Sequence, residues 1–264
     1  MSVETQIQRI KDSIESAYTA ILNKNGVAYG NSSDQLATSI NSIQPSIYYG
    51  MDVNEAVTLE TVNGVLQHKT PSTTEITLSF NGVKEIQQPA FCSIFVYRDN
   101  IKAVSFPQLK KVYKNALYNT FASTEVATAE FPVLETVLEN GMESCLSQTP
   151  LTTISFPALK TVGQYGLSGC FYSCINLTSV SFPALQTIEA YGLANTFYGC
   201  TSLSSISFPS LTSVNNLSFY YPTFTQCTAL TEIHFRADMR TKIEAINGYS
   251  SKWGAVNATI YFDL

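Results

Sequence analysis

Residues 177–188 read LTSVSFPALQTI, and the pattern L-x-x-[VI]-x-F-P-x-L-x-x-[VI] recurs along the chain. Neighbouring copies are LTTISFPALKTV at residues 151–162 and LSSISFPSLTSV at residues 203–214. The Phe of each Phe-Pro-x-Leu core, here called the marker phenylalanine, is Phe106, Phe131, Phe156, Phe182 or Phe208, at intervals of 25, 25, 26 and 26 residues. Phe80, Phe235 and Phe262 extend this phase in both directions. A period near 26 residues predicts a repeat solenoid.

The first half of each unit predicts a strand that ends at a corner. Val180 and Phe182 are two residues apart, which places both side chains on one face of a strand. Pro183 cannot donate to a strand ladder, so the strand should end there. Leu185 and Ile188 then point inward from a second short strand.

The second half of each unit has apolar positions of its own. Eleven residues after the marker come Phe91, Leu117, Met142, Leu167, Leu193 and Phe219. Fifteen residues after it come Phe95, Phe121, Leu146, Phe171 and Phe197, with Phe224 one place late. A gap of four fits one face of a short helical or 3₁₀ turn. Because no unit can bury its apolar side chains alone, several units must stack.

This pattern, followed by an aromatic-rich segment that ends in Cys-Thr-Ser-Leu at residues 200–203, resembles the BspA-type leucine-rich repeats. The resemblance covers roughly residues 73–264 and about seven units, with weaker copies around Phe80 and Phe131. It implies a leucine-rich repeat solenoid of short parallel strands, closed by a C-terminal cap strand. Members of the family occur in bacterial, protist and phage-derived surface proteins, so the resemblance also implies a role in adhesion.

The N-terminal residues predict a separate helical module over 1–44. Val3, Ile7, Ile10, Ile14, Ala17 and Ile21 are spaced as the a and d positions of heptads, and Asn25-Gly26 ends that helix. A second helix is expected from Asp34 to Ile43, with Ser32 and Gln35 as its capping box. The two helices can form a hairpin, or residues 1–22 can join copies of the chain through Ile7, Ile10, Ile14 and Ile21. This segment resembles the N-terminal modules of phage and prophage tail proteins. Residues 45–72 predict a linker or a small hairpin that caps the start of the solenoid.

The composition excludes several classes of protein. Charged residues make up 13% of the 264 residues, the net charge is −5, and no cluster of Lys and Arg occurs, which argues against nucleic-acid binding. No apolar run reaches the roughly 18 residues of a membrane-spanning helix, so no membrane insertion is expected. Residues 1–22 alternate charge and Ile and do not resemble a signal peptide.

The cysteines and histidines indicate neither a cofactor nor a catalytic site. Cys174, Cys200 and Cys227 share one repeat position, Cys145 and Cys170 share another, and Cys92 stands apart. Small, weakly polar thiols suit a stacked interior, so we expect buried free thiols, although bridges between coils are geometrically possible.

Two histidines, His68 and His234, are too few for a typical zinc site. His234 could pair with Ser207 one coil earlier and with Glu232, but an exposed position on the strand ladder is the simpler interpretation. The sequence has no nucleophile elbow, zinc-protease, P-loop or dinucleotide motif, so we expect no enzyme.

Two sets of side chains should lie on the surface. The strand positions before the markers are mostly hydroxyls: Ser79, Ser105, Glu130, Ser155, Ser181, Ser207 and His234, with Thr77, Ala103, Thr128, Thr153, Ser179, Ser205 and Glu232 two residues further back. The tyrosines are better candidates for ligand contact, because a ring with a polar tip suits sugar or protein surfaces. They are Tyr165 and Tyr191, nine residues after the marker, Tyr172 and Tyr198, sixteen after it, and Tyr220 and Tyr221 in the next coil. Alternatively, they only cover the turns between coils.

Together these features predict a non-enzymatic binding or structural protein. The setting expected from both resemblances is a phage or prophage tail-associated or receptor-binding component, located in the virion or at a cell surface and cytoplasmic before assembly or release. The partner would be a protein or glycan on a cell surface. The alternative is a secreted or cell-surface bacterial adhesin that binds a host protein or glycan.

Overall fold

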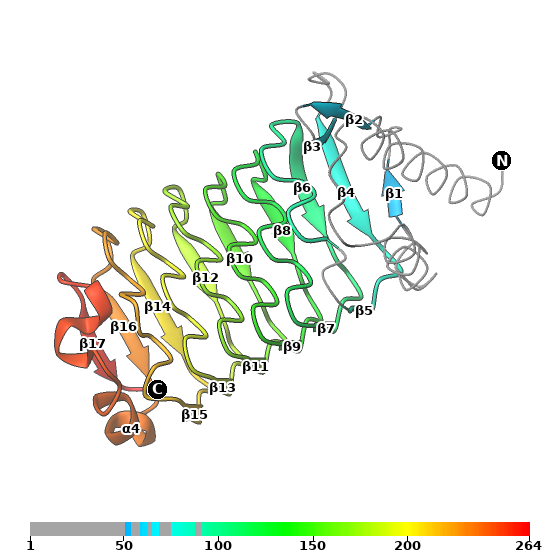
Figure 1. The fold of residues 1–264 in the computed structure, drawn as a ribbon. Helices are drawn as coiled ribbons and strands as arrows, with labels where there is room; N and C mark the ends of the chain where they lie inside the picture. Colours follow the sequence, from blue (N-terminus) through cyan, green and yellow to red (C-terminus); the bar gives the residue numbers. More distant parts are fainter. Residues whose placement is uncertain (1–50, 54–58, 63–64, 69–74, 88–90) are drawn as a thin grey trace, which may run out of the picture.

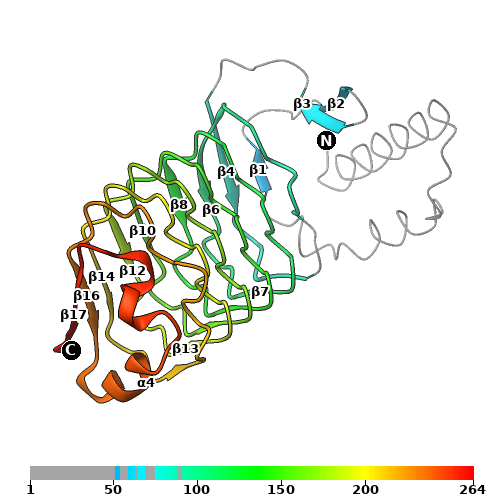
Figure 2. The same ribbon diagram turned by 60° about the vertical axis from the view of Figure 1, so that its left-hand side comes forward.

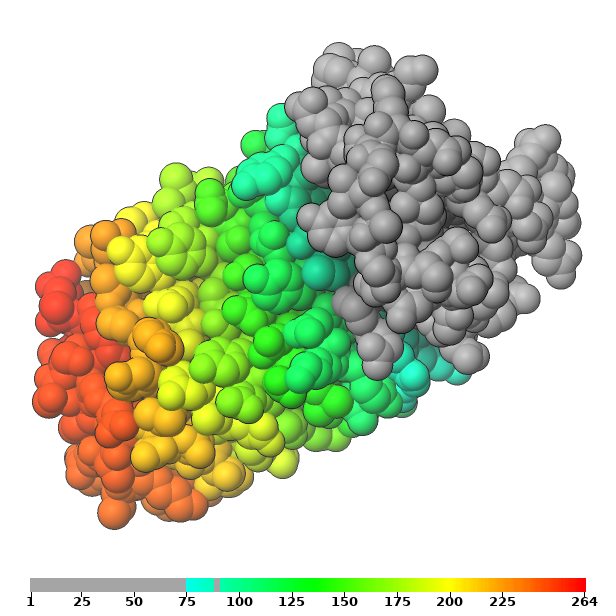
Figure 3. Space-filling view, in the orientation of Figure 1, coloured from blue at the N-terminus to red at the C-terminus, as the bar shows by residue number. Residues whose placement is uncertain are grey.

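A computed structural model of the chain describes residues 51–53, 59–62, 65–68, 75–87 and 91–264. The polypeptide winds as a stack of similar coils, and each coil contributes a strand, a corner, a second short strand and a returning segment (Figure 1). In the space-filling view, residues close in sequence form successive bands along the molecule (Figure 3). The predicted repeat solenoid is therefore confirmed.

The first strand of every coil lies beside the first strand of the next coil. These strands are β4 (Ile76–Phe80), β6 (Ile101–Ser105), β8 (Thr128–Glu130), β10 (Thr153–Ser155), β12 (Ser179–Ser181), β14 (Ser205–Phe208), β16 (Glu232–Phe235) and β17 (Thr259–Phe262). Within the groups β4–β6–β8, β10–β12 and β14–β16–β17 they pair in parallel and in the repeat register, as with Ser155 opposite Ser181 and Ser207 opposite His234. Antiparallel β1 (Met51–Val53) pairs with β4 at the N-terminal edge.

The second strands form a six-stranded parallel sheet after the corner. They are β5 (Glu85–Ile86), β7 (Lys111–Val112), β9 (Thr136–Val137), β11 (Thr161–Val162), β13 (Thr187–Ile188) and β15 (Ser213–Val214). From the second to the fifth of these strands, the inward side chain is fully or almost fully buried; these are Val112, Val137, Val162 and Ile188. The corner after Pro183 thus turns Leu185 and Ile188 inward, as their spacing predicted.

The marker phenylalanines form one internal row. Ring centroids of consecutive members, from Phe80 to Phe262, lie 4.4–6.2 Å apart, and the rings are stacked. From Phe80 to Phe235 each ring is at most 1% exposed. Because each ring packs on the rings of the coils before and after it, the row shields apolar surface that a single coil could not.

The returning segment is not helical, which corrects one element of the predicted fold. Residues 114–123 form consecutive turns, and Asn115, Asn119 and Ser123 have φ values of 57°, 51° and 54°. The same four-residue rhythm recurs at 140, 144 and 148, at 165, 169 and 173, and at 191, 195 and 199. Alternate backbone N–H groups donate to the next coil, such as Leu117 N to Gly141 O at 2.8 Å. The four-residue apolar period therefore reflects a run of turns rather than a helix. The backbone of these turns can hydrogen-bond to the neighbouring coil, whereas the backbone of a helix bonds only within the helix.

The helical elements of the described residues lie at the C-terminal end. They are η1 (Ala237–Met239), α4 (Arg240–Glu244) and η2 (Tyr249–Gly254), and they cross the last coil (Figure 2). Trp253, which is 2% exposed, stacks on Phe219 with ring centroids 4.7 Å apart. The Trp253 carbonyl accepts a 2.9 Å hydrogen bond from Phe224 N, so this segment takes the place of a further coil.

The N-terminal predictions fall mainly outside the described residues. The helices expected within residues 1–44, including Ile7, Ile10, Ile14 and Ile21, lie there. In the expected linker or cap region, β2 (Leu59–Val62) and β3 (Val65–His68) form an antiparallel hairpin.

Candidate functional site

The six candidate tyrosines lie on the face formed by the returning segments, here called the turn face. Tyr165 and Tyr191 occupy equivalent positions in adjacent coils, and their rings stack at 4.7 Å with planes 5° apart. Tyr172 and Tyr198 stack in the same way at 4.8 Å. The predicted columns therefore exist, while the role of these residues in ligand contact stays a prediction.

The next coil extends the first tyrosine column into a cluster. Tyr220 and Tyr221 lie 5.9 and 5.8 Å from the Tyr191 ring, and 5.1 Å from each other. Their exposed fractions are 42% and 52%. We call Tyr165, Tyr191, Tyr220 and Tyr221 the tyrosine cluster.

Several of these tyrosines adopt a backbone conformation that is unfavourable for a bulky side chain. The φ angles of Tyr165, Tyr191 and Tyr221 are 54°, 59° and 58°. At the position of Tyr165 and Tyr191, two earlier coils carry Asn115 and Asn140, and Asn tolerates positive φ far better. The left-handed conformation costs a residue of this kind on the order of 1–2 kcal/mol. The fold therefore does not explain tyrosine at these positions.

The strand face carries the hydroxyl ladder that the sequence predicts. Ser155, Ser181 and Ser207 are exposed, while the intervening Ile154, Val180 and Ile206 point into the core. Over β10, β12 and β14 the outward side chains of this face are uncharged. Since strong contact sites favour Tyr, Trp and Arg, the turn face is the better candidate for binding.

Five of the six cysteines are buried, and all six are free thiols. Cys174, Cys200 and Cys227 donate to carbonyls of the preceding coil at 2.9–3.1 Å. Earlier coils place Thr124 and Thr149 at this position. The other cysteine position, that of Cys145 and Cys170, is filled by Thr120, Thr196 and Thr223 elsewhere. These thiols thus occupy positions where other coils have threonine hydroxyls. The expectation of buried free thiols is confirmed for these five cysteines, whereas Cys92 is free but only half-buried.

We expect only one cysteine to react with a thiol reagent in the folded protein. Burial raises the pKa of Cys145 and of Cys227 to about 12, and it also raises the pKa values of Cys170, Cys174 and Cys200. These thiols stay protonated and shielded at pH 8, and only the thiolate is reactive. An Ellman assay should show fast reaction of the half-buried Cys92 alone. The Cys92→Ser variant should lose the fast phase, and two or more fast thiols in the native chain would contradict the account.

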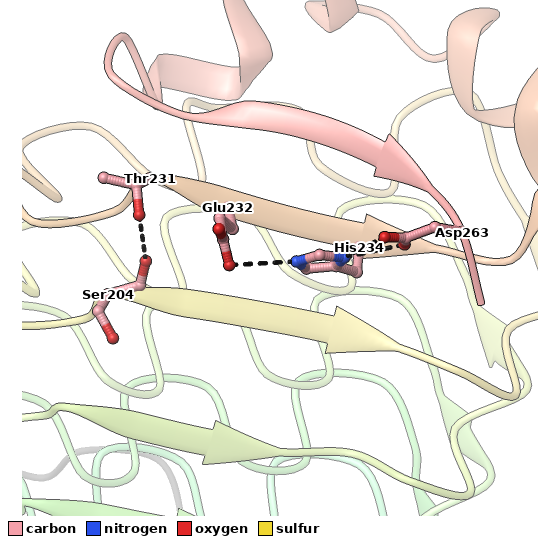
Figure 4. Close-up of polar contacts among 5 residues, drawn as sticks. All are labelled: Ser204, Thr231, Glu232, His234 and Asp263. Carbon is pink, nitrogen blue, oxygen red and sulfur yellow. Dashed lines mark hydrogen bonds and ion pairs between the residues drawn. The ribbon is translucent and has the colours of Figure 1, made fainter.

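His234 lies between two carboxylates at the C-terminal end of the strand face (Figure 4). Its Nδ1 is 2.9 Å from Asp263 Oδ1, its Nε2 is 3.4 Å from Glu232 Oε2, and its ring stacks on Tyr261 at 4.9 Å. Both ring nitrogens are therefore engaged by carboxylates rather than by Ser207. The arrangement connects β16 to the residue after β17. His234 lies on the strand ladder as expected, but its side chain is partly buried, at 22% exposure, rather than exposed.

The His234 contacts should stabilise the fold more at low pH than at high pH. Partial burial lowers the pKa of His234, but the hydrogen bonds to Asp263 and Glu232 and their charges outweigh this and raise it. A raised folded-state pKa gives stability that is present below the unfolded-state pKa and lost as the pH rises through the folded-state value. We expect His234→Gln to cost about 0.5–1 kcal/mol more at pH 5.5 than at pH 8.5, because both carboxylates are half exposed. Urea unfolding at both pH values measures this difference; the same cost at both would contradict it.

The part of the chain that the structure describes holds no group of three or more His, Cys, Asp or Glu side chains suited to a metal ion. No helix within those residues is long and apolar enough to cross a bilayer.

The stacked parallel strands, the buried marker row and the 25–27-residue period define a leucine-rich repeat solenoid. A family model described as BspA type leucine rich repeat region (6 copies) matches residues 60–191 and 142–250. The chain belongs to this family, whose repeats indicate a protein-binding or adhesion-type structural role. No curated protein matches the chain. The family match does not reach residues 1–44, so their resemblance to phage tail modules stays a prediction.

Proposed function

We propose that the chain is a non-enzymatic binding protein that attaches to a protein or glycan on a cell surface through the tyrosines of its turn face. The observation that carries this proposal is the tyrosine cluster itself, in which four rings lie together and Tyr165, Tyr191 and Tyr221 take left-handed positions where other coils use Asn, Ser or Gly. Strain that packing does not require is typical of functional positions. Tyrosine also supplies large contact area at little cost in side-chain entropy.

The binding test replaces each strained tyrosine by the residue type found in equivalent coils. A Tyr165→Asn, Tyr191→Asn, Tyr221→Asn variant should fold at least as stably as the parent, because the left-handed positions then carry a tolerant residue. Its binding to bacterial cells and to protein and glycan arrays should fall at least tenfold.

Tyr97→Asn is the matched control, because Tyr97 is 77% exposed, also has positive φ, at 60°, and lies outside the cluster. The control should bind as the parent does. Unchanged binding of the triple variant would reject the turn face as the contact surface. Binding confined to host proteins or glycans would favour the adhesin over the phage setting.

We also propose that residues 1–44 attach the solenoid to a second copy or to a larger particle, in a phage or prophage tail. This rests on the stripe of Ile7, Ile10, Ile14 and Ile21 in the sequence. Light scattering of the full chain should give a multiple of the 29.0 kDa monomer mass, and Ile10→Asp with Ile14→Asp should return it to the monomer. A monomeric parent chain at all concentrations would remove the basis for self-association.

A further inference from the structure

We propose that the tyrosine cluster, together with Glu143 and Glu189, binds the cationic side chains of a protein partner, arginine above all. This inference rests on the proposed function and names the chemistry of the partner. Glu189 Oε2 accepts a 3.2 Å hydrogen bond from Gln164 N, directly before Tyr165. Glu143 lies one coil before Tyr165, on the same turn face.

The ionisation of Tyr165 responds to its burial and to the neighbouring phenols and the Glu143 carboxylate. The pKa of Tyr165 is raised, first by desolvation and then by Tyr191, Tyr221 and Glu143. Partial burial also raises the pKa of the Glu143 carboxyl. The surface therefore combines aromatic rings and negative charge within one small area.

Among the described residues, no Lys or Arg forms an ion pair with a carboxylate of this area. The returning segments 140–150, 163–174, 189–200 and 215–227 contain neither Lys nor Arg. Two other carboxylates of nearby repeats have basic partners, Glu139 with Lys114 at 2.7 Å and Glu135 with Lys160 at 3.0 Å. Glu143 and Glu189 have no ion-pair partner among the residues that the structure describes. Charge complementarity therefore favours a cationic ligand.

The molecule already contains the same combination in a filled form. The Lys111 Nζ lies 4.6 Å from the centroid of the Tyr113 ring, and the Tyr113 hydroxyl donates to Glu85 Oε2 at 3.2 Å. A cation over a tyrosine with a neighbouring carboxylate is thus satisfied internally on an earlier coil. At the tyrosine cluster, the rings and the carboxylates are present, and no described Lys or Arg lies over a ring there.

Ring stacking favours a cation over a sugar at this position. Tyr165 and Tyr191 cover each other's facing surfaces at 4.7 Å, so those surfaces cannot stack on a pyranose. The Tyr221 ring is tilted by 37° from Tyr191 and is exposed, which leaves a face for a guanidinium group. Arginine stacks on aromatic rings more readily than lysine does.

The test uses a blocked tetra-arginine peptide and its tetra-citrulline counterpart, which has nearly the same shape without the charge. Calorimetric titration of the full chain at pH 7.5 should show binding of the arginine peptide and at least tenfold weaker binding of the citrulline peptide. Glu143→Gln with Glu189→Gln, and separately Tyr221→Asn, should each weaken arginine binding about threefold to tenfold. Tyr221→Phe should retain most of the affinity, because the ring remains.

Glu75→Gln with Glu130→Gln is the control for net charge, because it also removes two exposed carboxylates and both lie away from the turn face. It should bind the arginine peptide as the parent does. Equal binding of the two peptides, or an equal loss in Glu75→Gln/Glu130→Gln and Glu143→Gln/Glu189→Gln, would overturn the proposal. Binding of glucosamine, but not of the arginine peptide, at the cluster would also overturn it in favour of an amino sugar. If Tyr165→Asn/Tyr191→Asn/Tyr221→Asn abolished cell binding while no arginine peptide bound, the proposed function would stand and the cationic partner would fall.

Discussion

Replacing Phe182 by Ala should destabilise the solenoid by about 3–5 kcal/mol, the range for deleting a buried aromatic ring. Phe182 is 1% exposed and packs between Phe156 and Phe208, at centroid distances of 5.5 and 6.2 Å. The substitution leaves a void in the middle of the marker row, and the coils before and after it each lose their ring contact with this coil. Urea unfolding followed by circular dichroism measures the change in the free energy of unfolding.

The control for this substitution is Ser181→Ala, one residue earlier in the same strand. Ser181 is exposed on the strand face, so its loss should cost less than about 0.5 kcal/mol. Similar costs for the two variants would mean that Phe182 does not lie in a packed interior row.

Replacing Trp253 by Ala should also cost about 3–5 kcal/mol and should detach the C-terminal segment from the last coil. The indole stacks on Phe219, makes an edge contact with Phe235 at 6.2 Å, and donates from Nε1 to Asn247 O at 3.0 Å. Without it, the apolar end of the core meets water. Solenoids need such a terminal cap to stay soluble and folded.

Trp253 is also the single tryptophan of the chain, so its own fluorescence reports on the cap in the parent protein. Trp253→Phe should recover more than half of the lost stability, because a ring still covers Phe219. A Trp253→Ala protein as stable as the parent, or a parent emission maximum typical of exposed indole, would contradict the cap.

The strand half of each coil was predictable because its period is strict. Phenylalanines that are 25–27 residues apart cannot contact each other within one coil. They meet only when coils stack, so the period itself predicts their alignment in one row. The burial of Val180, Phe182, Leu185 and Ile188 agrees with their spacing. Pro183 marks the corner, because it cannot continue the ladder.

The turn half was predicted with the right buried residues and the wrong backbone. Leu167 and Phe171 are four residues apart, which fits a helix and a run of four-residue turns equally well. The residues between the apolar positions hold the distinguishing signal. Asn115, Asn119 and Asn195 recur at the left-handed positions, and Asn is the non-glycine residue that most readily accepts them.

Sequence reasoning named one of the two partners of His234, Glu232, and missed the other, Asp263. Asp263 lies 29 residues further on, directly after the last marker position Phe262, so it belongs to none of the strand columns. Glu143 and Glu189, the carboxylates near the tyrosine cluster, were missed for another reason. They occupy different positions in their repeats, so the sequence pattern does not group them as it groups the tyrosines.

Disulfide trapping between exposed strand positions tests the stacked-coil architecture most directly. Ser155 and Ser181 are exposed register partners on β10 and β12, at a strand separation that a disulfide can span. Mild oxidation of dilute Ser155→Cys/Ser181→Cys protein should give an intramolecular crosslink, identified by mass spectrometry. Ser155→Cys/Ser207→Cys, which places a whole coil between the two thiols, should give none. Failure of the first pair to form, or equal crosslinking of the second, would contradict a solenoid of coils stacked in this register.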